Sequence, residues 1–218
     1  MRIRQINKLL AGLLVLICFE CSKKGDEVNS SGEIKVDEFQ FKEGGTLTDW
    51  QCINAAEDKV CIPNKWKTSA SKDFHFFAHL KSQESKNSFF VVVRYDTGDV
   101  KIDLTTYLQE VVKQIKADTN EISNEGNFRY LTFEKSSPCY YGEFITEING
   151  EKYYTYSMYT IRFGYLYDFT LKTQGVDKDN SYKDFQNVLF NYQVGNQYLF
   201  KKEDPVVSVK LIDPNSFL

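Results

Sequence analysis

The sequence predicts an α+β domain in which an antiparallel β-sheet meander is packed by two amphipathic helices. Three observations carry this prediction. Residues 103–118 place apolar side chains at helical spacing, and residues 181–192 repeat that pattern over a shorter length. Between them, residues 128–172 alternate strand-like runs with turns. Strands that follow one another without helices between them are typical of an antiparallel sheet with helices packed on it.

The first helical segment is the clearer one. Its apolar residues fall on one stripe, and Asp103 stands where an N-cap residue is expected. In the second segment, Ser181 and Asp184 resemble a capping box. The apolar stripe of the first helix consists of Leu104, Tyr107, Leu108, Val111, Val112 and Ile115, and that of the second of Phe185, Val188, Leu189 and Tyr192.

The strands are predicted from β-branched and aromatic runs bounded by turn residues. Asn149-Gly150 is the preferred dipeptide of a type I′ hairpin turn. Strands are expected at residues 74–81, 88–95, 128–135, 139–148, 152–161 and 165–172, and residues 198–212 could add a terminal strand.

The first residues resemble the signal of a bacterial lipoprotein. A basic start is followed by the apolar run 9–19, which is too short to cross a bilayer but suits a signal peptide. Cys21 and a polar stretch follow, and this start is similar to lipoproteins of the Bacteroidota. The resemblance implies a lipoprotein signal peptide at residues 1–20, a lipid on Cys21, a flexible tether at 21–45, and a single α+β domain with a C-terminal tail at 46–218.

Two alternatives stay open at this end of the chain. Glu20 replaces the small residue that usually precedes the lipidated cysteine, so Cys18 is a rival site. A cleaved secretory signal or an uncleaved membrane anchor would also place the rest of the chain outside the cytoplasm. The expected location is lipid-anchored in the cell envelope, at the outer membrane and facing the periplasm or the cell surface.

The composition limits the class of partner. The net charge of −3 argues against binding to nucleic acid. Aromatic residues make up 15% of the chain, with 14 tyrosines and 17 phenylalanines, so one compact core can form.

The cysteines predict one disulfide. An exported protein meets an oxidising environment, so Cys52 and Cys61, which enclose a short polar segment, are expected to pair. Closing that loop constrains the unfolded chain by roughly 2–3 kcal/mol. Cys139 is then a free, poorly reactive thiol. A metal site at these cysteines is the weaker alternative, because no C-x-x-C spacing and no nearby histidine accompany them.

The sequence predicts no catalytic residues, no cofactor and no metal site. The two histidines, His75 and His79, would lie about 13 Å apart on a strand, too far to share one ion. The G-x-S-x-G motif of a nucleophilic serine and a glycine-rich phosphate loop are both missing from the sequence.

Tyrosines are the most suggestive residues of the body. They fall on both faces of the strand at 152–161, and one face must be core. The other face would be an exposed binding surface unless a helix covers it, in which case both sets are core. The candidate binding surface consists of Trp66, Tyr153, Tyr154, Tyr156 and Tyr159.

Several segments together resemble the Mog1/PsbP-like fold. They are Ile62-Pro63 followed by Trp66, the run SFFVVVRYD at 88–96, the first helix, the tyrosine-rich meander, and SYKDFQNVLF at 181–190. The resemblance covers about residues 50–195 and implies an α/β/α sandwich. It also implies a binding or assembly factor rather than an enzyme, and it transfers no site residue.

The functional expectation is a membrane-anchored, non-catalytic envelope lipoprotein that acts as an accessory or protein-binding module. Its partners would be another envelope protein and, through the lipid, the membrane. The alternative is a lipoprotein that binds a small ligand, a sugar or a lipid, in a pocket between sheet and helix.

Overall fold

The computed structural model describes residues 30–34, 47–81, 88–98, 102–118, 127–148, 150–174, 178–201, 204–213 and 216. The predicted signal peptide, the predicted lipidation site Cys21 and most of the predicted tether lie outside these residues. Within them, no helix is both long and apolar enough to cross a membrane.

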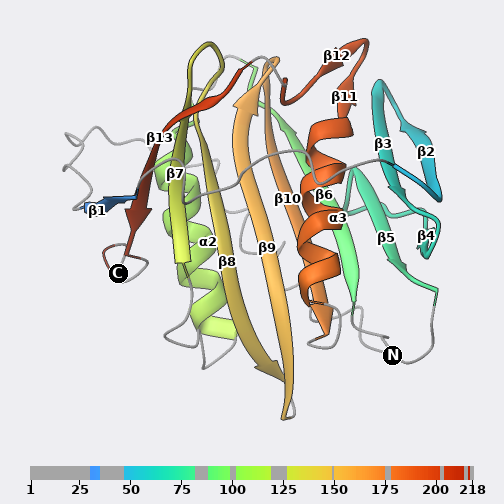
Figure 1. Ribbon diagram of the computed structural model, residues 1–218, viewed down its shortest axis with the longest axis horizontal. Coiled ribbons are helices and arrows are strands. Elements are labelled where there is room, and N and C mark those ends of the chain that lie inside the picture. The colour runs from blue at the N-terminus through green and yellow to red at the C-terminus, as the bar shows by residue number, and fades with distance from the viewer. Residues whose placement is uncertain are drawn as a thin grey trace.

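Two antiparallel sheets and two helices make up the described chain (Figure 1). The larger sheet has nine strands in the order β1-β13-β7-β8-β9-β10-β6-β5-β4, and the smaller has four in the order β12-β11-β3-β2. The larger sheet consists of β1 (Ser30–Ile34), β4 (Trp66–Thr68), β5 (Phe76–Leu80), β6 (Phe89–Asp96), β7 (Asn127–Phe133), β8 (Cys139–Ile148), β9 (Glu151–Arg162), β10 (Tyr165–Gln174) and β13 (Val206–Ile212). The smaller sheet consists of β2 (Trp50–Ala55), β3 (Asp58–Pro63), β11 (Gln193–Val194) and β12 (Gln197–Tyr198).

The helices lie on opposite faces of the large sheet. In Figure 1, α3 (Lys178–Asn191) lies in front of β10, and α2 (Leu104–Asp118) lies behind β7 and β8. The meander β7-β8-β9-β10 pairs in sequence order, as the sequence predicts. The predicted α+β class, an antiparallel meander packed by two amphipathic helices, is confirmed.

Each face of the sheet has its own apolar core. On the α3 side, Phe185, Val188 and Leu189 pack against strand residues such as Tyr156 and Phe169. On the α2 side, the predicted stripe of that helix packs against Phe128, Phe144 and Tyr159. Because side chains alternate along a strand, neighbouring tyrosines of β9 enter different cores.

Of the two N-terminal caps predicted from the sequence, the structure confirms one and contradicts the other. The Asp103 cap is confirmed, because its Oδ2 accepts a hydrogen bond from the backbone N–H of Thr106 at 2.9 Å. The capping box at Ser181 and Asp184 is wrong, because α3 begins at Lys178. Ser181 is buried and donates to Thr173 Oγ1, while Asp184 pairs with Lys65.

The second sheet is the main feature that the sequence prediction lacks. The segment between Cys52 and Cys61, expected to be a polar loop, is a β-hairpin of β2 and β3. The two cysteines are direct cross-strand partners and form the predicted disulfide. Cys139 is a free, buried thiol whose pKa is raised by burial. β1 forms one edge of the large sheet and pairs with β13, so strand structure begins inside the predicted tether.

A glycine in β8, Gly142, leaves room for the ring of Phe128 on the neighbouring strand β7. Gly142 lies opposite Phe128 of β7, and a Cβ at position 142 would be 2.6 Å from Cε1 of that ring. Phe128 is fully buried against Phe144, so the ring has little room to move.

Replacing Gly142 by alanine should therefore lower the free energy of unfolding by about 1–3 kcal/mol through overpacking. Urea denaturation measures the change. Phe128→Leu removes the clashing ring, so the double variant should lose clearly less stability than the sum of the single variants. Full additivity would contradict the proposed clash.

Candidate functional site

Three hairpin turns gather at one end of the molecule, the upper end in Figure 1. They are residues 56–57 between β2 and β3, 163–164 between β9 and β10, and 195–196 between β11 and β12. The backbone N–H of Gly195 donates to the carbonyl oxygen of Glu57 at 2.8 Å, which joins two of the turns. We call these three turns the turn end. Turns carried on a rigid sheet are a common position for binding residues.

Phe163 is the most unusual residue of the turn end. Its φ is 53° and that of Gly164 is 81°, the pattern of a type I′ turn in which Asn, Asp or Gly is preferred. A bulky side chain in this left-handed region costs on the order of 1–2 kcal/mol. Phe163 is 44% exposed, so burial offsets little of that cost. The turn thus presents an aromatic ring to solvent in a strained conformation.

The Phe163 turn is held from the neighbouring strand. Thr97, directly after β6, donates its backbone N–H and its hydroxyl to the Gly164 carbonyl oxygen at 2.9 and 2.7 Å. Two hydrogen bonds to one carbonyl restrict the backbone of the turn that carries Phe163.

Arg162 fixes the other side of the same turn. Its guanidinium lies 5.0 Å from the ring of Phe133 and 4.4 Å from that of Phe200. It donates hydrogen bonds to the backbone carbonyls of Ser137 and Leu199. Leu199 follows Tyr198, a second aromatic residue of the turn end that is 46% exposed, so Arg162 restrains the backbone next to it.

A buried carboxylate lies beneath the turn end. The Asp58 side chain is fully buried, and four elements meet at it. Arg94 Nη1 of β6 lies 3.1 Å from its Oδ1 and 2.6 Å from Glu57 Oε1. His75 Nε2, just before β5, lies 2.8 Å from its Oδ2, and the Tyr192 hydroxyl, after α3, donates to the same oxygen. We call Asp58, Glu57, His75, Arg94 and Tyr192 the Asp58 cluster.

The protonation states of this cluster follow from burial and charge. Burial alone would lower the pKa of Arg94, but the charges of Asp58 and Glu57 outweigh it and raise that pKa. Burial and the charge of Asp58 raise the pKa of Tyr192, so its hydroxyl stays a donor. Arg94 also stacks 4.4 Å above the ring of Tyr165, which begins β10 beside the Phe163 turn. The cluster therefore holds the small sheet, α3 and the turn end in a fixed relation.

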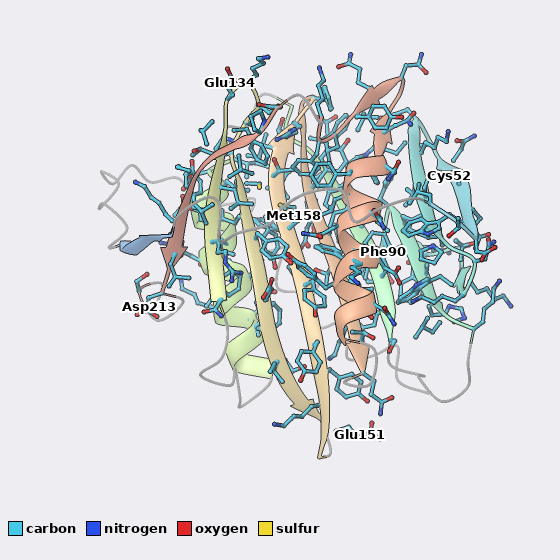
Figure 2. All side chains as sticks on the ribbon, in the orientation of Figure 1. Cys52, Phe90, Glu134, Glu151, Met158 and Asp213 are labelled. Atoms are coloured by element: carbon cyan, nitrogen blue, oxygen red, sulfur yellow. A yellow bond between two sulfur atoms is a disulfide. The ribbon has the colours of Figure 1, made fainter. Side chains whose placement is uncertain are left out.

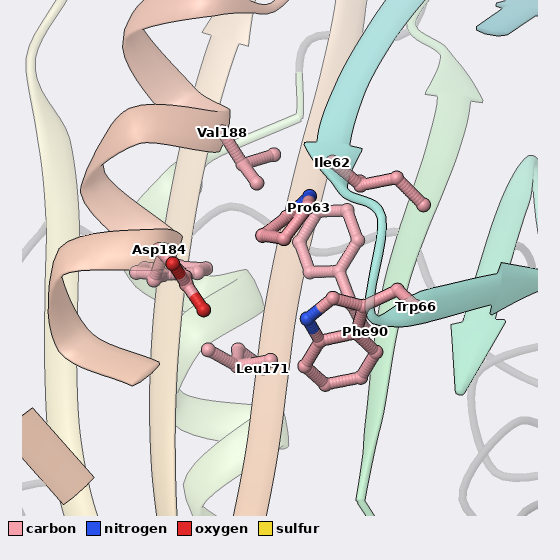
Figure 3. Close-up of a pocket in the computed structure, with 8 residues that line it drawn as sticks. Ile62, Pro63, Trp66, Phe90, Leu171, Asp184 and Val188 are labelled. Atoms are coloured by element: carbon pink, nitrogen blue, oxygen red, sulfur yellow. The ribbon is translucent and has the colours of Figure 1, made fainter. Parts of the chain in front are cut away.

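A shallow apolar hollow lies farther down the molecule, between α3 and the turn after β3 (Figure 3). Lys65 Nζ and Asp184 Oδ2, 2.5 Å apart, bridge the two elements beside it. Its empty space is about 220 Å³ including the open mouth, and the enclosed part has room for roughly one water molecule. Ligand pockets usually hold about 300–1,000 Å³. The hollow is lined by Ile62, Pro63, Trp66, Phe90, Leu171, Asp184, Phe185 and Val188.

The predicted aromatic binding surface is wrong for four of its five residues. Trp66, Tyr153, Tyr156 and Tyr159 are no more than 3% exposed, and Tyr154 is half-buried. The physical reason is that both faces of β9 are covered. The α3 core takes Tyr156 and contacts Tyr154, and Tyr159 joins the α2 core. Trp66 lines the hollow rather than presenting its ring to solvent.

The histidines do not share a site. His75 contacts Asp58, whereas His79 Nδ1 lies 3.4 Å from Ser69 Oγ. In the described part of the chain, no group of three or more His, Cys, Asp or Glu side chains could hold a metal ion.

Sequence reasoning missed both the buried Asp58 and the exposed Phe163 with its positive φ. Asp58 sits in the segment interpreted as a loop, where nothing marks it as buried. Phe163 does leave a signal, because it precedes Gly164 in a turn where Asn or Asp is usual.

Comparison with known proteins gives the fold. No family model matches the chain, and no curated protein matches it by sequence. The solved structure of cyanobacterial PsbP (CyanoP) from Synechocystis sp. PCC 6803 superposes with a TM-score of 0.52 at 13% identity. That match covers 68% of this chain and 94% of CyanoP. The chain has a PsbP-like fold. This confirms the fold implied by the sequence resemblance.

Two other solved structures are less similar. A protein from Bacteroides thetaiotaomicron has 11% identity and a TM-score of 0.41, covering 72% of this chain and 50% of its own. LpqN, involved in cell envelope biogenesis of Mycobacterium tuberculosis, has 12% identity and a TM-score of 0.37, covering 75% of this chain and 91% of its own.

Asp58→Asn should lower the free energy of unfolding by about 2–4 kcal/mol, because Arg94 and Tyr192 would lose a buried charged partner. Thermal and urea denaturation measure the change. Asp73→Asn is the matched control, because Asp73 is an exposed carboxylate close in sequence to His75. A loss no larger than that of the control would show that the cluster does not hold the small sheet.

Proposed function

We propose that this protein is a non-catalytic accessory protein of the cell envelope, held at a membrane by a lipid on Cys21, that binds a partner protein through its turn end. The signal-like residues 1–20 and the cysteine that follows them support the anchor. The PsbP-like fold is compatible with this role but does not decide it.

The observation that carries the binding role is the Phe163 turn. An exposed aromatic ring in a strained backbone conformation lowers the stability of the folded domain. A contact between this ring and another molecule explains best why it is present. The backbone that carries the ring is also held in advance, because Thr97 binds the Gly164 carbonyl and the Arg162 side chain binds the Ser137 carbonyl, and this reduces the backbone entropy lost on binding. Phenylalanine, like tyrosine and tryptophan, is enriched in the cores of protein interfaces.

The alternative of a sugar- or lipid-binding pocket receives less support. The hollow beside α3 is the place between sheet and helix where such a ligand would enter, and its enclosed volume is too small for one.

The anchor is tested by Cys21→Ala, which should release the protein from membranes, whereas Cys18→Ala should not. Each buried CH₂ of a lipid chain adds about 0.8 kcal/mol to membrane binding, so losing all chains removes firm anchoring. Fractionation and intact-protein mass measure the outcome. Lipid on Cys18, or no lipid, would contradict the assignment.

The binding role is tested by Phe163→Asn, which should have two opposite effects. The free energy of unfolding should rise by about 1 kcal/mol, because Asn-Gly suits a type I′ turn and relieves the strain. Binding to the partner should fall, because the anchor ring is lost. Denaturation gives the first effect.

Site-specific photo-crosslinking in intact cells gives the second. A photoreactive residue at position 163 should yield a discrete protein adduct that excess purified wild-type domain suppresses and the Phe163→Asn domain does not. Position 152 is the control, since it is exposed and next to Glu151, at the end opposite the turn end (Figure 2). Equal adducts at both positions, or adducts with lipid alone, would overturn the proposal.

A further inference from the structure

A carboxylate lies under the first turns of α2, in the middle of β10. Asp168 belongs to the row of β10 residues that faces α2, with Tyr159 of β9 and Val93 of β6 as its cross-strand neighbours. The polar residues in this row of β10 would suggest that it faces solvent. Instead, the Tyr107 side chain of α2 lies on it.

The carboxylate links three elements. The Tyr107 hydroxyl of α2 donates to Asp168 Oδ2 at 2.9 Å, and the Thr170 hydroxyl of β10 donates to Oδ1 at 3.2 Å. The hydroxyl of Ser157 in β9 lies 3.1 Å from that of Thr170. Tyr107 also packs against Tyr95 and Tyr159, so the hydrogen bond to Asp168 is enclosed by rings.

No cation balances this carboxylate among the described side chains. The titratable groups that face it are Tyr107 from α2, Tyr95 from β6 and Tyr159 from β9. Burial and the nearby Asp168 charge raise the pKa of all three, that of Tyr95 to about 12, so all three are neutral near pH 7. The nearest cation along β10 is Lys172, four residues or about 13 Å away.

Burial raises the pKa of Asp168 from its usual 3.8 to about 6, although the hydrogen bonds from Tyr107 and Thr170 lower it. An ionised Asp168 is thus a charge without a cationic partner among the described side chains, and its pKa lies in a pH range that the envelope location of the proposed function would expose it to.

We propose that Asp168 is an acid-tightened latch for α2: the protonated carboxyl group lets the helix sit firmly on the sheet, and its ionisation loosens the first turns of the helix. The protonated group keeps its bond from Tyr107, and the Thr170 hydroxyl can rotate to accept its proton.

The direction of the pH effect follows from linkage. The pKa of this acid is higher when α2 is docked than when it is open, so the docked state binds more protons between about pH 4 and pH 6. Docking is therefore weakened as the pH rises through that window and stays weakened above it. If the open state has the usual pKa of 3.8, the opening constant of α2 rises about tenfold between pH 5 and pH 7.5.

Amide hydrogen exchange of the full chain tests the latch at pH 5 and pH 7.5, after correction for the intrinsic exchange rates. The α2 amides of the wild type should be about tenfold better protected at pH 5. Asp168→Asn, which cannot ionise, should abolish that difference. Asp73→Asn, the exposed control, should retain it.

Tyr107→Phe gives a second variant should Asp168→Asn fold poorly. It removes a hydrogen bond that favours the ionised form, so the pH at which α2 loosens should move upwards. The proposal is overturned if wild-type α2 shows no pH difference, if Asp168→Asn retains it, or if the change is equal over the strands of the sheet.

Discussion

The buried carboxylate of Asp58 is the contact on which the arrangement of this domain depends. Among the described residues no strand of the small sheet pairs with a strand of the large one, so side-chain contacts fix their relation. Asp58 does so by accepting from Arg94 of β6 and from Tyr192 after α3, with His75 beside it. A buried charge is unfavourable unless it is paired and hydrogen-bonded, and here both carboxylate oxygens are engaged. The same contacts that satisfy the charge therefore fix the relative positions of hairpin, helix and large sheet.

The abundant aromatic residues are explained mainly by the two cores. A sheet that is covered on both faces must fill two layers, and rings supply much buried area with few rotatable bonds. Tyrosine adds a hydroxyl that can hydrogen-bond at the edge of a core, as Tyr140 does with Thr105 and Tyr107 with Asp168. Tyrosine content therefore indicates a core with polar margins in this chain, and a binding surface has to be sought among exposed rings such as Phe163.

The sequence predicts the elements whose signals are local and leaves out those that depend on distant partners. The stripe of α2, its Asp103 cap and the meander of β7 to β10 repeat at short intervals, so periodicity finds them. The Cys52–Cys61 pair follows from spacing and an oxidising environment. In contrast, the β2–β3 hairpin is short and polar, and its burial at Asp58 depends on Arg94, His75 and Tyr192, which lie 17 to 134 residues away. The prediction of an exposed tyrosine surface was wrong for a related reason. The sequence of one strand does not show whether helices cover one of its faces or both.

The strain at Phe163 can persist only because its surroundings are rigid. A two-residue turn in solution would relax away from an unfavourable φ, but Thr97 holds the Gly164 carbonyl and the buried Arg162 holds the strand before it. Thr97 in turn extends β6, the strand whose Arg94 is fixed by Asp58. The stability of the interior thus maintains an exposed conformation that the turn would not choose alone. Strained residues of this kind cluster at functional sites, and this links the buried charge beneath the turn end to the proposed binding role above it.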